Sequence, residues 1–191
     1  LSMEAQQIIE HEGGTAPKVP EVQAEVRALA PQPVSASPLD LPAEVFRSGL
    51  DRRKENRAAL MEWVRAALVE GVDYGRIHVV GKDRCKQGRH CQNPNHFSKP
   101  SLFKPGAEKI CGMLGVTVHY PTLADYEQTA LNGIHIQNVI IRCEIQDAAG
   151  RVVADGVGAR SLKQDYGDIN KALKMAEKSA HIDATLRMAG L

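Results

Sequence analysis

The sequence predicts an α+β fold in which an antiparallel β-meander, preceded by a short hairpin, packs against helices. Apolar residues recur at helical spacing before residue 70 and after residue 168. Apolar segments bounded by turn residues fill the region between them and are typical of strands. The expected order of helix, hairpin, helix, three strands and helix is that of an α+β domain. With 191 residues, of which 43% are hydrophobic, the chain is long enough for one domain with its own core.

The first 41 residues differ in composition from the rest of the chain. They contain five prolines and six acidic residues but only two basic residues, separated mainly by Ala, Ser and Gln. Such a segment cannot bury enough apolar surface to offset the entropy lost on ordering. We therefore expect residues 1–41 to form a flexible acidic tail and residues 42–191 to form the folded domain.

The first helix of the domain is expected over residues 42–70. Proline is well tolerated in a first helical turn, and Leu60, Trp63 and the apolar residues after them recur at helical spacing. Gly49 is expected to interrupt this helix, and Gly71 supplies a stop signal.

A short hairpin and a second helix follow. Residues 73–80 and 101–103 are expected to be the paired strands, with residues 81–98 inserted between them as a polar, cationic loop. Pro105 near the start and Gly115 at the end predict a helix over residues 104–115.

Three strands are then expected over residues 116–127, 134–146 and 151–162. The first contains Pro121, which suggests an edge strand, and the second changes its alternation near Asn138, as a bulge would cause. In the last helix, Asp168 is expected to be the N-cap residue and Gly190 the stop signal.

Charge and hydropathy exclude several classes of protein. A net charge of +1 argues against a uniformly basic protein that coats nucleic acid, although a local basic groove remains compatible with it. No segment approaches the ~20 apolar residues that span a bilayer, and the N-terminus lacks a secretory signal pattern. We therefore expect a cytoplasmic protein without a membrane partner.

The charges are segregated along the chain. Residues 81–109 carry seven basic and two acidic residues, and residues 160–191 carry six basic and four acidic ones. In the last helix, Lys171, Lys174, Lys178, His181 and Thr185 fall on the side opposite Ala172, Ala176 and Ala180. This side is either the solvated face of an amphipathic helix or a stripe that follows phosphates.

Four residues within the inserted loop are candidate metal ligands: Cys85, His90, Cys91 and His96. Structural zinc sites use four sulfur and nitrogen ligands, and a polar loop without a core gains order from such a site. The sequence therefore predicts a structural Zn²⁺ site, the alternative being a flexible basic loop whose thiols and imidazoles are incidental. Cys111 and Cys143 are expected to be small core residues.

Common catalytic motifs are absent. There is no GxxxxGK[ST] phosphate loop, GxSxG motif, HExxH helix or GxGxxG after a strand, so we expect no nucleotide cofactor and no enzyme activity. A metal-dependent nuclease, drawing on Asp125, Glu144 and Asp155, is a further alternative, although the Lys that usually follows is missing after Glu144-Ile145-Gln146.

Two segments resemble blocks of the Rad-fifty-two-type single-strand annealing superfamily, in particular its phage and mobile-element recombination proteins. One extends from Lys99-Pro100-Ser101-Leu102-Phe103 to Ile110, and the other is the helix from Asn170 to Gly190, which ends in Leu-Arg-x-x-Gly. The resemblance covers roughly residues 72–191. Asp183 and Ala184 stand where eukaryotic members carry a basic doublet, and Arg187 matches.

This resemblance implies that an oligomeric ring binds single-stranded DNA in a basic groove and anneals complementary strands without ATP, in homologous recombination or DNA repair. The tail would then be a site for other recombination or replication proteins, and the protein would act in a bacterial or phage-infected cell. The candidate phosphate contacts are Lys99, Lys104, Lys109, Arg160, Lys163, Lys171, Lys174, Lys178 and Arg187.

Only eight aromatic residues occur, so extensive base stacking is not expected; Phe103 and Tyr166 are either stacking residues or packing residues. The alternative function is a zinc-stabilised interaction or scaffold module of a phage or plasmid assembly that binds nucleic acid weakly.

Overall fold

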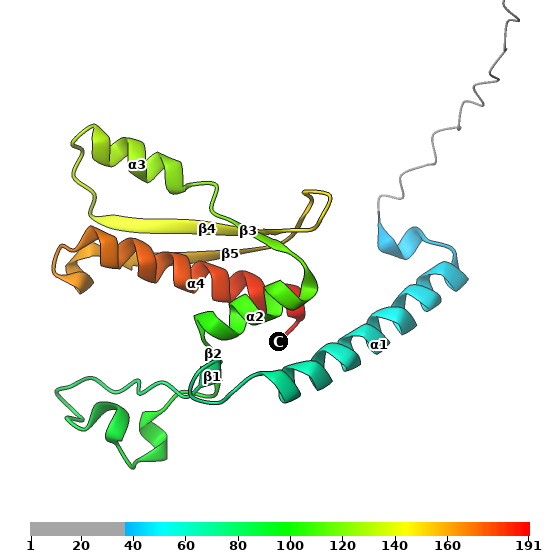
Figure 1. Ribbon diagram of the computed structural model, residues 1–191, viewed down its shortest axis with the longest axis horizontal. Helices are drawn as coiled ribbons and strands as arrows, with labels where there is room; N and C mark the ends of the chain where they lie inside the picture. Colours follow the sequence, from blue (N-terminus) through cyan, green and yellow to red (C-terminus); the bar gives the residue numbers. More distant parts are fainter. Residues whose placement is uncertain (1–36) are drawn as a thin grey trace, which may run out of the picture. The chain divides into compact units, whose positions relative to one another are not determined.

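The computed structural model describes residues 37–191 and confirms the mixed α+β class (Figure 1). Ser37–Pro42 belong to one unit and contain the 3₁₀ turn η1 (Pro38–Asp40), in which the Ser37 hydroxyl accepts a hydrogen bond from the Leu39 amide. Ala43–Leu191 form a second compact unit. The predicted tail lies, over residues 1–36, outside the described part of the chain.

Helix α1 (Ala43–Ala67) is continuous through Gly49, so the predicted interruption is wrong. Its last turns carry the apolar residues that the helical spacing indicated. Leu60 and Trp63 pack against a small core cluster of Leu68, Ile110 and Ala189. The Arg57 guanidinium also donates a 2.8 Å hydrogen bond to the Ala189 carbonyl, which links α1 to the end of the chain.

The predicted hairpin is present as two very short antiparallel strands, β1 (Tyr74–Gly75) and β2 (Ser101–Leu102). The long connection between them contains the 3₁₀ turns η2 (Gly88–His90) and η3 (Pro94–His96). Helix α2 (Lys104–Leu114) follows as predicted and ends at Gly115, whose φ of 66° is a left-handed conformation that suits glycine.

The three-stranded sheet is the predicted meander, with the antiparallel order β3 (Thr117–His119), β4 (Asn138–Gln146) and β5 (Val152–Ser161). The first predicted strand is wrong in its second half, where α3 (Leu123–Leu131) replaces it. The Tyr126 hydroxyl donates to the Ile140 carbonyl at 3.0 Å and accepts from the Ile140 amide at 2.7 Å. A side chain of α3 therefore satisfies the edge of β4 that the short β3 leaves unpaired.

The predicted bulge lies elsewhere. Asn138 is the first residue of β4, and the register with β5 shifts between Ile145 and Gln146, next to the hairpin turn.

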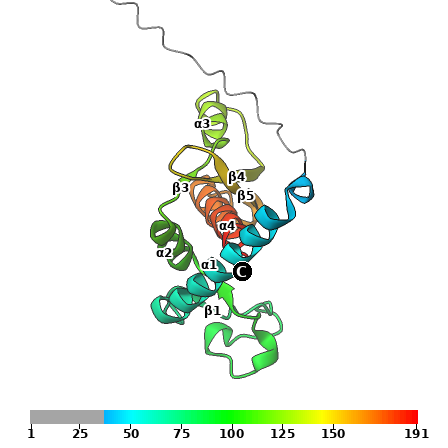
Figure 2. The same ribbon diagram turned by 90° about the vertical axis from the view of Figure 1, so that its right-hand side faces the viewer.

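Helix α4 (Ile169–Ala189) lies along one face of the sheet in both views (Figures 1 and 2). Asp168 caps it by accepting from the Lys171 amide at 3.0 Å, and Gly190 ends it with a φ of 65°, as predicted. Among residues 37–191, no helix combines the length and the apolar character needed to cross a membrane.

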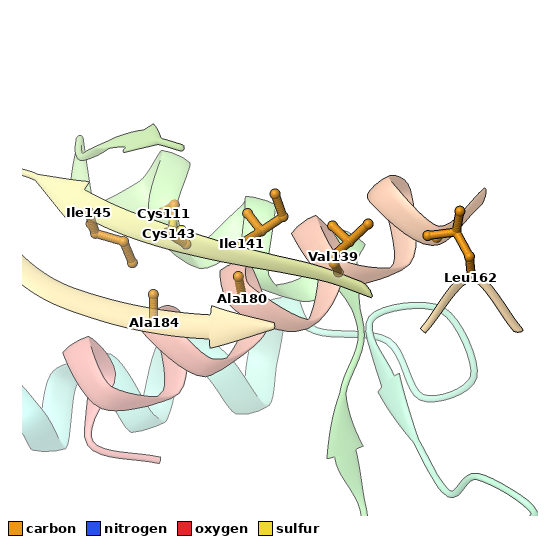
Figure 3. Packing of buried hydrophobic residues seen from close by; sticks show 10 residues of the cluster. Cys111, Val139, Ile141, Cys143, Ile145, Leu162, Ala180 and Ala184 are labelled. Atoms are coloured by element: carbon orange, nitrogen blue, oxygen red, sulfur yellow. The ribbon is translucent and has the colours of Figure 1, made fainter. Parts of the chain in front are cut away.

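The main core lies between α4 and β4–β5. The inward side chains Val139, Ile141, Cys143 and Ile145 of β4 face the helix (Figure 3). On α4, small side chains are buried against the sheet at regular helical spacing: Ala172, Ala176, Ala180 and Ala184. Gly156 and Gly158 of β5 lie directly against the α4 backbone, where a Cβ at Gly156 would come within 2.5 Å of the Ala180 carbonyl oxygen. Small residues on both elements therefore set the close approach of α4 to the sheet.

Candidate metal centre and candidate nucleic-acid interface

Four side chains of the β1–β2 connection converge on one point. One ligand atom from each of His78, Cys85, Cys91 and His96 lies within 4.8 Å of every other. Each of the four side chains is partly buried. This cluster could hold a metal ion.

The backbone of the hairpin positions the two histidines. Beyond β1 and β2 the paired chains continue to a bridge between His78 and Phe97, and the Val79 amide donates to the His96 carbonyl at 2.9 Å. This pairing places the imidazoles of His78 and His96 side by side, with ring centroids 5.7 Å apart. The two cysteines come from the irregular part of the connection between these histidines.

One pair of ligand atoms in the cluster lies at a distance that suits a tetrahedral site. Cys91 Sγ lies 3.3 Å from His96 Nδ1. Zn–S and Zn–N bonds of about 2.3 and 2.0 Å imply ligand–ligand edges of roughly 3.3–3.8 Å. The Asn93 amide also donates a hydrogen bond to Cys91 Sγ at 3.4 Å.

His78 Nε2 provides independent support for a ligand at this position. It is buried and has no hydrogen-bond partner within the described chain. A buried, unpartnered imidazole nitrogen is costly unless it binds something, and coordination of a metal would satisfy it.

The structure corrects one member of the predicted ligand set. His90 is exposed at the end of η2, where its Nε2 accepts a 3.2 Å hydrogen bond from Arg89 Nε, and it lies outside the cluster. His78 takes the expected place of His90. Of the adjacent residues His90 and Cys91, only Cys91 belongs to the cluster, whereas strand pairing brings His78 opposite the other end of the connection.

The chemistry available to this cluster is structural. Two cysteine and two histidine ligands complete a tetrahedral shell, which leaves no position for a reactive water molecule. Residues 76–100 contain no fully buried side chain, so the connection has no hydrophobic core of its own. An ion at this point would therefore cross-link a segment that has no buried core of its own.

The predicted phosphate contacts divide into two groups. Five of the nine form ion pairs: Lys104 with Glu108 at 3.4 Å, Lys109 with Asp73 at 2.6 Å, Arg160 and Lys171 with Asp165 at 2.8 and 3.3 Å, and Arg187 with Asp183 at 3.0 Å. The structure therefore gives these five cations acidic neighbours that charge counting along the sequence did not reveal.

Asp165 organises the start of α4. Its buried carboxylate accepts two parallel hydrogen bonds from the Arg160 guanidinium, at 2.8 and 2.9 Å, and lies 3.3 Å from Lys171 Nζ. Hydrogen bonding to Arg160 is the main cause that lowers the pKa of Asp165 to about 2, with a smaller contribution from Lys171. Arg160 and Lys171 thereby join the end of β5 to the first turn of α4.

Asp73 plays a corresponding part at the hairpin. Its buried carboxylate accepts from the Val69 amide at 2.9 Å and from Lys109 Nζ at 2.6 Å, which ties the end of α1 to α2. The hydrogen bond from Lys109 is the main cause that lowers the pKa of Asp73.

The other four predicted contacts, namely Lys99, Lys163, Lys174 and Lys178, have no acidic partner within 4 Å in the described chain. Lys174 and Lys178 are four residues apart on α4 and so lie on one side of the helix. Lys163 is exposed in the 3₁₀ turn η4 (Leu162–Asp165), which leads into α4.

Tyr166 lies between these lysines along the chain. It caps η4 in a left-handed conformation with a φ of 56°, and 97% of its surface is exposed. The interpretation of Tyr166 as a packing residue is therefore wrong. Phe103, in contrast, is half-buried and lies against Gly75, where a Cβ would be 3.2 Å from its ring.

Two residues predicted for the exposed side of the last helix are buried. His181 and Thr185 both contact Cys111 of α2 at 3.5 Å, because α2 packs against the side of α4 that the pattern assigned to solvent. Burial lowers the pKa of His181 and raises that of the Cys111 thiol, so both groups are neutral packing residues.

The carboxylates considered for a nuclease lie on different elements. Glu144 and Asp155 are opposite one another on β4 and β5, and Asp155 forms a 2.7 Å ion pair with Arg142. Asp125 is on α3.

Comparison of the chain with protein-family models, curated proteins and solved structures gives no match in any of the three. The functional assignment therefore depends on the arrangement of the residues themselves.

Proposed function

We propose that this protein binds single-stranded DNA and anneals complementary strands without ATP, in recombination or repair. The observation that carries the proposal is the set of lysines along η4 and α4 that have no acidic partner in the described chain: Lys163, Lys174 and Lys178. Lysines at i and i+4 lie about 5–6 Å apart, a spacing comparable to the phosphate repeat of a nucleic-acid strand.

The charge and stacking properties of this surface suit a single strand. Ammonium groups neutralise phosphates and release counterions, which gives sequence-independent and salt-sensitive binding. Tyr166, three residues after Lys163 in the chain, offers an exposed aromatic ring on which one base can stack. Contacts made mainly to the backbone leave most base edges free to pair with a second strand, as annealing requires.

The resemblance to Rad-fifty-two-type proteins adds the expectation of an oligomeric ring. In support of it, the elements after residue 72 follow the order hairpin, helix, meander and helix, with the additional helix α3 inserted between the first two strands of the meander. Sizing of the purified chain by light scattering tests the ring, because a monomer would contradict it.

A DNA-binding measurement tests the proposal at the level of residues. The triple variant Lys163→Glu, Lys174→Glu, Lys178→Glu is compared with a control of equal charge change on α1, Arg47→Glu, Arg52→Glu, Lys54→Glu. We expect the first variant to weaken binding of single-stranded oligothymidine by at least about tenfold and to reduce the salt dependence by roughly 0.7 per lost phosphate contact. The control is expected to change affinity by less than about twofold.

Two results would contradict the proposal. One is equal or tighter binding of duplex DNA by the wild-type chain. The other is an equal loss of affinity in the two triple variants, which would show that net charge alone governs binding.

We also infer that the metal at the Cys/His cluster is zinc. Two cysteines and two imidazoles form a donor set that Zn²⁺ prefers, and their ligand atoms lie within 4.8 Å of one another. Metal analysis of the purified protein should give about one zinc per chain for the wild type and for His90→Ala, and clearly less for His78→Ala and Cys91→Ser. Equal zinc in all four proteins would refute this site.

A second candidate is a zinc-stabilised interaction module. It is favoured by apolar side chains exposed on the sheet, among them Ile140, Val153 and Val157 at 57%, 49% and 43% exposure. Zinc binding without affinity for single-stranded DNA would support this candidate over annealing.

A further inference from the structure

The β1–β2 connection lines an open hollow of about 740 Å³. This volume falls within the range of about 300–1,000 Å³ that is common for ligand sites. Four basic side chains line it: Arg76, Lys82, Lys86 and Arg89. No carboxylate is among its lining residues in the described chain.

The positive charge of the hollow is not neutralised locally. Asp83 is the single acidic residue between positions 76 and 100, and its 3.9 Å ion pair is with Arg84, which does not line the hollow. The four lining cations have no ion-pair partner within 4 Å among the described residues. They therefore form a local concentration of positive charge that attracts an anion.

The remaining lining is largely apolar and includes an aromatic ring. Ile77, Val80 and Phe97 contribute to the wall. Phe97 is held by an edge-to-face contact with His78, with centroids 5.3 Å apart. Cations beside a fixed aromatic ring are the combination with which proteins bind the phosphate and the base of one strand together.

The hollow and the metal cluster share residues. His78 and Cys85 line the hollow and are also two of the four metal-ligating side chains. A divalent ion bound to two thiolates adds no net charge, so the cations of the connection keep their full positive field when the metal is bound. Because residues 76–100 have no buried core, the ion would fix the positions of the cations relative to one another.

We propose that this hollow is a second binding site for single-stranded nucleic acid, which takes phosphates on Lys86 and Arg89 and a base on Phe97, and which requires the bound metal. This inference rests on the proposed function and adds to it a site separate from the lysines of α4. The ligand is a phosphodiester chain, since free phosphate could occupy the cations but could not use Phe97.

The test combines a charge variant with metal removal in the full chain. Binding of labelled oligothymidine is measured by fluorescence anisotropy for the wild type, for Lys86→Glu with Arg89→Glu, and for the matched control Arg52→Glu with Lys54→Glu. Inorganic phosphate and thymidine monophosphate serve as competitors. Metal content is measured for each protein, because Lys86 and Arg89 are exposed non-ligands and should leave the zinc in place.

We expect the loop variant to bind about tenfold more weakly than the wild type and the control to change by less than about twofold. Chelation of the metal should weaken the wild type by a similar factor and have little further effect on the loop variant. Phe97→Leu should lose affinity at all salt concentrations, because stacking is not screened as ion contacts are.

Several outcomes would overturn the inference. If the Lys163, Lys174, Lys178 variant loses affinity but the loop variant matches its control, the proposed function stands and the second site does not exist. If inorganic phosphate competes as well as thymidine monophosphate, the hollow is an anion site and not a strand site. If the wild type binds no single strand, both proposals fail together.

Discussion

The contact between α4 and β5 leads to a sharp prediction about Gly158. A Cβ built at this position would overlap the Ala176 carbonyl oxygen and lie 2.7 Å from the Ala180 amide nitrogen. Both are backbone atoms of α4, which cannot turn aside as the end of a side chain can. Gly158→Ala therefore requires the whole helix to move away from the sheet by roughly 1 Å. A gap of this size removes about a quarter to a half of the energy of each van der Waals contact between α4 and the sheet.

The expected loss of stability in Gly158→Ala follows from the cost of overpacking a core. Insertion of one methyl group into a well-packed core usually costs about 1–3 kcal/mol, and an obstruction by backbone on one side belongs at the upper end. For a domain of about 150 residues, a loss of about 3 kcal/mol lowers Tm by roughly 6–12 °C. Thermal unfolding followed by circular dichroism measures this directly.

Gly112 provides the matched control. It lies inside α2, where a Cβ would meet nothing within 4 Å. Gly112→Ala should stabilise the protein by about 0.5–1 kcal/mol, because alanine loses less backbone entropy in a helix. The same chemical change is thus expected to have opposite signs at the two sites. A Gly158→Ala protein as stable as the wild type would refute the close packing of α4 on β5.

Three further predictions concern charge, backbone strain and the metal. Asp165→Asn should lower Tm at pH 7 by roughly 5–10 °C, since it breaks a buried pair with Arg160. The folded pKa of Asp165 is lowered to about 2, so the stabilisation from its ionised form is complete above pH ~4 and is lost as the pH falls towards 2. The curves of Tm against pH for the wild type and for Asp165→Asn should therefore converge between about pH 4 and pH 2. Parallel curves would contradict the ion pair of Asp165 with Arg160 as the cause of the stabilisation. Tyr166→Gly should raise the free energy of unfolding by up to about 1 kcal/mol, because glycine adopts the left-handed conformation without strain. The same variant should bind single-stranded DNA about fivefold or more weakly, because the exposed ring on which a base stacks is lost. Unchanged affinity would show that Tyr166 does not contact the DNA. Chelation of the metal should make residues 79–95 sensitive to protease. Tm should change by less than about 2 °C, because neither core cluster includes a residue of that segment. A large fall in Tm would show that the metal also stabilises the core.

The parts of the fold with strong local signals could be predicted from the sequence. Asp168 and Gly190 bound α4 as their capping chemistry indicates, and Gly115 ends α2 in the expected left-handed conformation. The third strand, β5, agrees with its prediction to within one residue at each end. In each case the decisive interaction lies within a few residues of the signal.

The predictions from the sequence that were wrong involve contacts between distant segments. The predicted strand after residue 116 becomes α3 in its second half, where Tyr126 binds the free edge of β4, fourteen residues away. The side of α4 with His181 was assigned to solvent because nothing in its periodicity reveals that α2 packs there. His78 could have been found from the predicted hairpin, since pairing of its strands brings that residue opposite His96 and Phe97.

Ion pairs explain why some of the cations predicted to contact phosphate have acidic partners in the structure. Arg160 and Lys171 share Asp165, although they belong to β5 and α4. A count of charges along a segment gives its net field but does not say which cation is bound to which carboxylate. Residue-level predictions of phosphate contacts therefore needed the tertiary structure.

The most direct test of the proposed function is the annealing of two complementary oligonucleotides by the purified chain, without nucleotide, followed by fluorescence quenching. We expect the wild type to accelerate annealing well beyond the spontaneous rate. The Lys163→Glu, Lys174→Glu, Lys178→Glu variant should lose most of this acceleration, while the Arg47→Glu, Arg52→Glu, Lys54→Glu control should retain it. A wild-type rate equal to that of the DNA alone would contradict the proposed function.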